Sequence, residues 1–324
     1  ISDSAGQTIP KGSYTHNVSG LRGDWVQNRL VDEVISRIYS KKSKICASRI
    51  AFCGKRNGVK EIYTVDFSGR NLQQITKYRT ITVEPAWSTD NRYLSYTVYG
   101  SQSANLIQMD VAQRKHRLLS HYPGLNAGAA FRPNGKDYAI TLSSGNKVDL
   151  YLMRNGSKKG MKLTNDHHVE ATPTWSPDGN KISYVKAQMR SNGKVSPPRL
   201  YMMDLIKKRS WPMFRDGVER VSPDWSKSSN ILVYSKRMGS QYVVAMCDAQ
   251  NPASEIILTK NAGDWEAPSW APDGRHIVCS RNLNGRQSLF IIDSKLKTQK
   301  EIFPTQSGRA YFQTMSLPAW SNLD

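Results

Sequence analysis

Two adjacent histidines with an acidic residue on either side come nearest, of all residues in this chain, to a metal-binding set. Asp166, His167, His168 and Glu170 lie within one short segment. Imidazole and carboxylate groups are the usual nitrogen and oxygen ligands of zinc. Neighbouring residues in an extended segment point to opposite sides, so two adjacent histidines rarely bind one ion. We therefore interpret the segment as a polar loop and expect no metal site there.

Aspartates and serines elsewhere could also do chemistry if taken singly. Asp178 and Asp273 stand in Pro-Asp-Gly turns and could bind calcium, but no EF-hand spacing surrounds them. A role in the turn itself already explains them. The segment "GSQSAN", which begins at Gly100, lacks the closing glycine of a G-x-S-x-G nucleophile elbow. The sequence therefore gives no support to a serine hydrolase.

The four cysteines, Cys46, Cys53, Cys247 and Cys279, have no zinc-like spacing. The last three fall in expected strands, where a small buried apolar side chain is their ordinary role. A Cys46–Cys53 disulfide would require an oxidising compartment, and the sequence leaves that question open.

The elements around these residues repeat along the chain. The segments "EPAWSTDNRYLSYT", "GAAFRPNGKDYAIT", "TPTWSPDGNKISYV", "SPDWSKSSNILVYS" and "APSWAPDGRHIVCS" align, and "LPAWSNLD" ends the chain. Internal repeats of 20–50 residues indicate solenoids or propellers. The repeat is anchored on aromatic residues 44 to 50 positions apart: Trp87, Phe131, Trp175, Trp225, Trp270 and Trp320.

Each repeat carries a second strand and closing turns. The second strands are "LIQMD", "LYLMR", "LYMMD", "VAMCD" and "LFIID", followed by short segments such as "HRLLS" or "EIILT". In the Pro-Asp-Gly turn, proline fixes the angle φ, and glycine can adopt the positive φ that a tight turn requires. The strand-ending aspartates are expected to cap the turns that follow them. About four short strands in a unit of this length form a propeller blade.

The two ends of the repeat region are complementary. Residues 49–76 hold three strands without a Pro-x-Trp strand, and the terminal "LPAWSNLD" is such a strand without a unit after it. We expect the C-terminal strand to complete the first blade, which removes the open sheet edges. The predicted fold is mainly all-β: a six-bladed β-propeller closed by the C-terminal strand.

Residues 1–45 do not belong to the repeat. The segment "GDWVQNRLVDEVISRIYSK" has the apolar spacing of an amphipathic helix, and "ISDSAGQTIPKGSY" has a polar, strand-like pattern. One strand and one helix cannot form a domain alone. We expect residues 1–45 to be the C-terminal part of an α/β N-terminal domain, and residues 46–324 to be the propeller.

The charge is strongly positive, with 46 Lys and Arg against 26 Asp and Glu and a formal net charge of +20. Such a surface attracts anions, or it reflects a basic compartment. No nucleic-acid-binding motif is present, and no apolar run approaches the ~18 residues that a membrane helix needs. We therefore expect no nucleic-acid partner and no membrane insertion.

The repeated P-x-W-S-P-D-G and L-Y-x-M-D elements, the helix followed by "RIAF", and the closing "LPAWS" resemble the TolB family of periplasmic propellers. The resemblance spans roughly residues 20–324. It implies a non-catalytic scaffold of the Tol–Pal system without a cofactor, contributing to outer-membrane integrity, cell division and colicin import. It also implies a monomer that binds the lipoprotein Pal at the tunnel mouth. Contact with TolA would need an N-terminal segment outside this sequence.

The resemblance implies that the tunnel-mouth residues stand just before each Pro-x-Trp. The third unit departs from the motif, since Ala129 and Phe131 replace its proline and tryptophan, and Leu125 stands where the family often has histidine. The expected partner-binding residues are Val83, Glu84, Asn126, Gly128, Ala171, Thr172, Val221, Ser222, Glu266, Ala267 and Ser316.

Two other functions stay open at this stage. One is a propeller enzyme, such as a lactonase or cyclase, with a metal in the tunnel. The other is a polyanion binder, suggested by the positive charge. Metal analysis and the salt dependence of binding would separate them from the scaffold.

Overall fold

The computed structural model describes residues 23–38, 45–145, 147–157, 159–190, 193–303 and 311–322, with side chains except at 23–27, 37–38 and 144. The strand-like segment expected near the N-terminus lies outside these residues, and so does most of the expected N-terminal domain. Within the described residues the chain forms the helix α1 (Gly23–Ile38) and 24 strands.

The strands form six units of four, and within each unit neighbouring strands pair in antiparallel fashion. Unit I consists of β24 (Thr314–Trp320), β1 (Arg49–Arg56), β2 (Val59–Asp66) and β3 (Gln73–Gln74). Unit II consists of β4 (Thr82–Trp87), β5 (Tyr93–Tyr99), β6 (Ala104–Asp110) and β7 (His116–Ser120). Unit III consists of β8 (Asn126–Phe131), β9 (Asp137–Ser144), β10 (Lys147–Arg154) and β11 (Met161–Lys162).

The second half of the chain repeats this arrangement. Unit IV consists of β12 (Val169–Trp175), β13 (Lys181–Ala187), β14 (Arg199–Asp204) and β15 (Arg209–Pro212). Unit V consists of β16 (Arg220–Trp225), β17 (Ile231–Met238), β18 (Gln241–Asp248) and β19 (Asn251–Ile257). Unit VI consists of β20 (Asp264–Trp270), β21 (His276–Leu283), β22 (Arg286–Asp293) and β23 (Thr298–Glu301).

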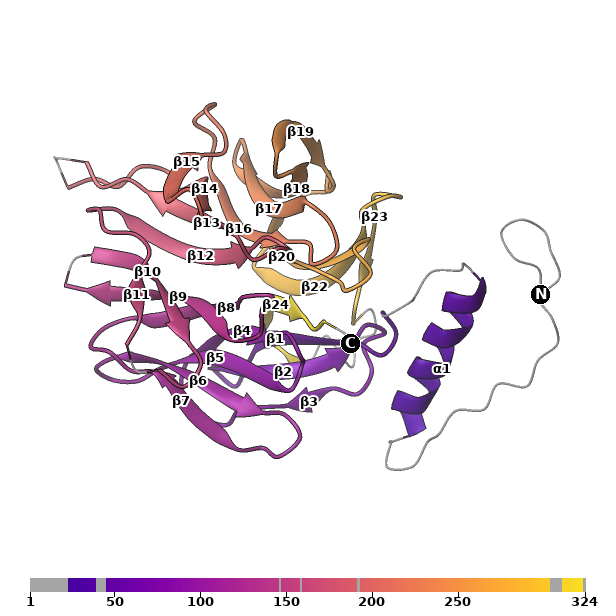
Figure 1. Ribbon diagram of the computed structural model, residues 1–324. Helices are drawn as coiled ribbons and strands as arrows, with labels where there is room; N and C mark the ends of the chain where they lie inside the picture. The colour runs from indigo at the N-terminus through magenta and orange to yellow at the C-terminus, as the bar shows by residue number, and fades with distance from the viewer. Residues whose placement is uncertain are drawn as a thin grey trace.

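The C-terminal strand closes the ring, as the sequence predicts. β24 pairs with β1, bringing Trp320 opposite Ile50 and Ser316 opposite Cys53, and the yellow β24 lies beside the indigo β1 in Figure 1. The first strands of the six units contact one another in a closed circle, β4–β8–β12–β16–β20–β24 and back to β4. Without β24 the inner edge of β1 would be unpaired, so the closing strand covers an edge that could otherwise pair with another chain.

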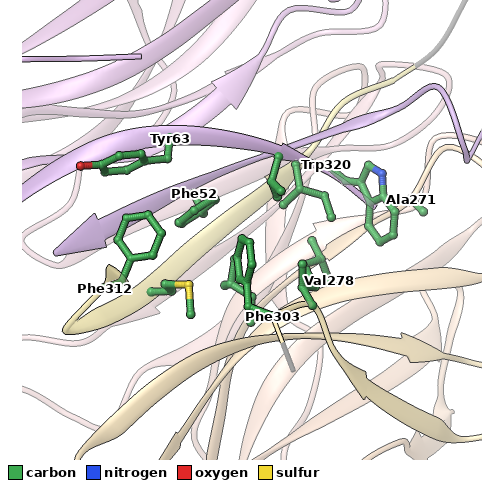
Figure 2. Close-up of a cluster of buried hydrophobic side chains, with 12 residues drawn as sticks. Phe52, Tyr63, Ala271, Val278, Phe303, Phe312 and Trp320 are labelled. Atoms are coloured by element: carbon green, nitrogen blue, oxygen red, sulfur yellow. The ribbon is translucent and has the colours of Figure 1, made fainter. Parts of the chain in front are cut away.

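The hydrophobic core is divided into six clusters, one for each junction between consecutive units. Figure 2 shows the cluster at the closure, where Phe52 and Tyr63 of unit I meet Val278 and Phe303 of unit VI. Phe312, just before β24, packs edge-on against Phe52 with ring centroids 5.4 Å apart. Each unit thus buries its faces against its two neighbours, so the six junctions share the stabilisation of the ring.

Aspartates hold the turns at one end of the ring, as expected. Asp204 Oδ1 accepts from the backbone N–H groups of Ile206 and Lys207, and Asp66, Asp110, Asp248 and Asp293 accept from backbone N–H groups of their own following turns. Asp178 and Asp273 likewise accept within their Pro-Asp-Gly turns. These aspartates therefore serve the turns.

Helix α1 lies outside the ring in Figure 1 and is joined to it by one buried carboxylate. Asp32 is 6% exposed, and its two oxygens accept from the backbone N–H groups of Cys46 and Ala47, at 3.0 and 2.8 Å. The same turn is tied to the closing strand, because Trp320 Nε1 donates to Ser48 Oγ at 2.6 Å. The helix is therefore fixed at the point where the two ends of the propeller meet.

Candidate functional site

Each first strand contains one bulge at the same place. The ladder between first and second strands shifts register just before the repeated aromatic residue in all six units. In unit II the pairs Val83↔Thr97 and Ala86↔Ser95 leave Tyr96 opposite two residues. Proline fits a bulge because it has no N–H to donate to the ladder. We call the six positive-φ residues at these bulges the bulge residues: Glu84, Gly128, Thr172, Ser222, Ala267 and Leu317.

The bulge residues line a central cavity of about 490 Å³. From there the cavity extends past the prolines and aromatic residues to the turns after the first strands, with Thr89 and Lys227 among them. A non-glycine residue with positive φ is uncommon, and such residues cluster at functional sites. All six bulge residues have positive φ, although five of them are not glycine. The same backbone geometry is therefore repeated around the whole tunnel.

The structure divides the sequence-predicted site residues into two groups. Glu84, Gly128, Thr172, Ser222 and Ala267 line the cavity. The remaining six lie one or two residues earlier, toward the end of the ring where the first strands begin, and do not line it: Val83, Asn126, Ala171, Val221, Glu266 and Ser316.

One residue of the second group has a structural task. Asn126 is fully buried, and its side chain accepts from Ser120 Oγ and Tyr122 N while donating to the carbonyl of Ala104. It therefore holds the loop that enters unit III.

Sequence reasoning omitted one bulge residue, Leu317. The signal was available, since "LPAW" aligns Leu317 with Glu84 of "EPAW". The prediction took the residue before it, Ser316, which faces Cys53 in the closing ladder.

Glu84 is the one bulge residue with a charged side chain. Its Oε2 accepts from Thr97 Oγ1 and from the backbone N–H of Gly128 in unit III, both at 3.1 Å. Burial raises the pKa of Glu84, while these two hydrogen bonds oppose the rise. The carboxylate therefore bridges units II and III, at the junction where Phe131 has no indole N–H.

A chain of hydrogen bonds joins units IV, V, VI and I around the tunnel. Thr174 Oγ1 accepts from the backbone N–H of Trp225, Asp224 Oδ2 accepts from that of Trp270, and Ser269 Oγ accepts from that of Trp320. These three side chains occupy the middle position of Pro-x-Trp. The carboxylate of Asp224 is thus engaged in structure, which makes it a poor candidate for a catalytic group.

Two polar clusters lie where the first strands begin, an end that we call the entrance. Arg220 is 1% exposed and forms ion pairs with Asp216 at 2.8 Å and Glu255 at 2.9 Å. Its guanidinium also lies 3.7 Å from the ring centroid of Phe214. A buried charge needs such partners to offset its lost hydration. The cluster fixes the loop that leads into unit V.

The second cluster contains Asp166, Glu170 and Lys186. Lys186 Nζ contacts Asp166 and lies 3.2 Å from Glu170 Oε1. Burial, together with the neighbouring Asp166, raises the pKa of Glu170 to about 8. His168 Nδ1 accepts from the backbone N–H of Met189, so this ring supports the loop. No group of three or more side chains in the described part of the chain is arranged to hold a metal ion.

Four large side chains with apolar surface are exposed in the segments that enter the first strands of units II and III and at the end of β5. Tyr78 and Ile81 precede β4, Tyr99 ends β5 and Tyr122 precedes β8, with exposures of 38%, 51%, 36% and 39%. Tyr99 N donates to the carbonyl of Ile81 at 2.9 Å, so these two residues are neighbours. We call these four residues the entrance patch.

The family model that describes the TolB beta propeller domain matches residues 37–324. The chain belongs to this family. This membership confirms the resemblance found in the sequence.

Individual relatives share less of the chain. A TolB homolog from Chlorobium luteolum is 31% identical over 169 residues, covering 52% of this chain and 37% of the relative. A protein named Tol-Pal system protein TolB from Anaeromyxobacter dehalogenans is 33% identical over 159 residues, covering 49% and 36%. The matched segments thus span little more than a third of these curated relatives.

Among solved structures, TolB from Acinetobacter baumannii superposes with a TM-score of 0.79 at 19% identity, covering 92% of this chain and 72% of that one. At this identity the likeness shows the fold. No helix within the described residues is long and apolar enough to cross a membrane.

Proposed function

We propose that this propeller is a non-catalytic protein-docking scaffold of a Tol–Pal cell-envelope system, located in the periplasm. Its partner is a Pal-like lipoprotein, which binds at the entrance of the central tunnel. The relatives named as Tol-Pal system proteins support this assignment. Contact with a TolA-like protein is assigned to a segment preceding the propeller, and roles in outer-membrane integrity and cell division follow from the assembly.

The observation that carries the proposal is the entrance patch beside the tunnel. Tyrosine and other large apolar side chains are enriched at the centres of protein interfaces. Burial and the nearby Glu84 raise the pKa of Tyr99, and Tyr99 N donates to the carbonyl of Ile81. We expect a partner that covers this patch to extend into the mouth of the tunnel. There its side chains would contact the hydroxyl groups of Thr172 and Ser222 and the carboxyl group of Glu84.

The rigidity of the tunnel favours docking over a moving catalytic site. The backbone of each first strand is fixed by a bulge, by cross-unit hydrogen bonds and by a buried core. A pre-formed surface loses little conformational entropy on binding, which increases affinity.

Calorimetric titration of the whole chain with the soluble domain of the cognate Pal-like lipoprotein tests the proposal. We expect saturable one-to-one binding. Absence of heat, together with no shift in the melting temperature on mixing, would reject it. The competing propeller enzyme is tested by elemental analysis of protein purified without chelators, where a tightly held stoichiometric metal required for turnover would favour the enzyme.

A further inference from the structure

A second cavity lies between units IV and V, near the turns at the end of the ring opposite the entrance. Its volume is about 240 Å³, and it shares no lining residue with the tunnel. β13, β14 and β15 with their turn contribute one wall, and β16 with two turns of unit V contributes the other. We call it the IV–V cleft; its polar and aromatic lining includes Lys181, Asp204, Lys207, Arg209, Trp211 and Trp225.

Trp225 and Trp270 differ from Trp87 and Trp175, because neither of their indole N–H groups has a hydrogen-bond partner in the described structure. The indole N–H groups of Trp87 and Trp175 donate to backbone carbonyls of the preceding units, at 3.2 and 2.9 Å. Trp225 is 1% exposed, and its Nε1 has no hydrogen-bond partner in the described structure. Trp225 lines the IV–V cleft rather than the tunnel. The Trp225 ring therefore forms part of the cleft wall, close to the cations described next.

The cleft also carries an excess of positive charge. No ion pair within the described part of the chain joins Lys181, Lys207 or Arg209 to a carboxylate. The single carboxylate in the lining is Asp204, and two backbone N–H groups of its own turn already donate to its Oδ1.

Two other units have an arginine partner that unit IV lacks. The corresponding aspartates of units II and VI, Asp110 and Asp293, pair with Arg92 and Arg275 at 2.9 and 2.7 Å. In unit IV the residue aligned with those arginines is Asn180, whose Nδ2 donates to Asp178 instead. Unit IV therefore lacks the ion pair of units II and VI, and its cleft is lined by three cations and one acid.

The rest of the cleft lining is aromatic and apolar, which suits contact with the carbon skeleton of an organic ligand. The guanidinium of Arg209 lies 5.2 Å from the ring centroid of Trp211. Met202 and Met213, 2% and 8% exposed, also line the cleft. The cavity of 240 Å³ corresponds to roughly eight water molecules, which is the size class of a monosaccharide derivative.

We propose that the IV–V cleft binds a small organic oxyanion, a phosphorylated or carboxylated molecule of sugar size. Lys181, Lys207 and Arg209 bind its anionic oxygens, and the rings of Trp211 and Trp225 form part of the wall around it. The apolar side chains contact the body of the ligand. This site is separate from the tunnel, so it neither requires nor excludes a partner at the entrance.

The test follows the indole N–H resonances of the full ¹⁵N-labelled chain during titration. The probes are glucose 6-phosphate, glucuronate, neutral glucose and inorganic phosphate. The resonance absent from Trp225→Phe identifies Trp225, and phenylalanine is tolerated at the same position in unit III, where Phe131 stands. We expect that resonance to shift saturably with at least one charged sugar. Arg209→Gln and Lys181→Gln should each weaken binding about tenfold, the loss of one charge-assisted contact.

Lys208→Gln is the matched control, because it removes one charge from the same turn but does not line the cleft. It should bind like the unmodified chain. The proposal is overturned if no probe shifts the Trp225 resonance at millimolar concentration, or if Lys208→Gln weakens binding as much as Arg209→Gln. If neutral glucose binds as tightly as the charged sugars, the ligand need not be an anion and the proposal fails. If inorganic phosphate binds as tightly as glucose 6-phosphate, the sugar part contributes nothing and the proposal also fails.

Discussion

The indole N–H of Trp87 donates to the carbonyl of Ala319, 232 residues later in the chain, at 3.2 Å. This hydrogen bond joins unit II to the closing strand of unit I. It is repeated between Trp175 and Ala130, while the junctions from unit IV to unit I use a side chain and a backbone N–H instead. The same indole-to-carbonyl hydrogen bond thus joins the closing strand to unit II and unit III to unit IV.

Trp87→Phe removes this hydrogen bond and keeps most of the buried ring. The expected loss is about 1 kcal/mol in the free energy of unfolding, the net contribution of a typical hydrogen bond. Trp225→Phe is the matched control, because the Trp225 indole N–H has no partner to lose. Urea denaturation of both variants measures the difference. Equal losses would show that the Trp87 bond does not contribute to closure.

Arg220→Met should be strongly destabilising, because it removes a buried cation and leaves the carboxylates of Asp216 and Glu255 with fewer partners. Breaking a buried pair costs about 3–5 kcal/mol. Arg286→Met removes a half-exposed arginine that pairs with Glu301 at 2.8 Å, and the cost there is about 0–1 kcal/mol. Chemical denaturation of the two variants compares them directly, and similar losses would contradict the role given to the Arg220 cluster.

The overall architecture followed from residues that repeat. The Pro-x-Trp spacing predicted the units, and the unmatched strand at the C-terminus predicted the pairing of β24 with β1 that the structure shows. Such features can be predicted because the same motif, a bulge followed by proline and a large aromatic residue, recurs along the sequence.

The site was only partly predictable, because its chemistry lies in residues that do not repeat. One structural position, five residues before the repeated tryptophan, is nearly inaccessible to solvent in units II, IV and V. It is occupied by Thr82, Glu170 and Arg220, respectively. Their partners come from loops of different length, such as Asp216 for Arg220. The unpaired indole of Trp225 is likewise invisible in the sequence, since it depends on where the ring of one unit faces its neighbour.

Glu170 should make stability depend on pH above the acid range. Its ordinary pKa is 4.5, and in the folded chain burial and Asp166 raise it to about 8. Between these values the unfolded chain has released this proton while the folded chain retains it, so stability falls as pH rises. The slope cannot exceed about 1.4 kcal/mol per pH unit for one proton.

Glu170→Gln removes that titration and should flatten the curve of unfolding free energy between pH 5 and 8, with a gain relative to the unmodified chain near pH 8. Denaturant titrations across this range provide the measurement. Asp166 acts in the opposite sense, since its pKa is lowered and its contribution is lost as pH falls through that lowered value. An unchanged slope in Glu170→Gln would contradict the assignment to Glu170.

The four cysteines are free and buried. Burial raises the pKa of Cys46 to about 12 and of Cys53 and Cys247 to about 11, and it also raises that of Cys279. A thiol reacts as the thiolate, so a thiol reagent at mildly alkaline pH should label none of them in the folded chain. In denaturant it should label all four. Labelling of only two in denaturant would show that the other two form a disulfide, and peptide mapping would test the Cys46–Cys53 pairing.

The central claim is that the entrance docks a protein partner, and a pair of matched variants tests it most directly. Ile81 in the entrance patch and Leu118 on the outer strand β7 are both 51% exposed. Calorimetric titration with the soluble domain of the cognate Pal-like lipoprotein should show that Ile81→Ser weakens binding about tenfold or more, as loss of a buried interface anchor does. Leu118→Ser should bind like the unmodified chain. Equal affinity for all three proteins would contradict the account.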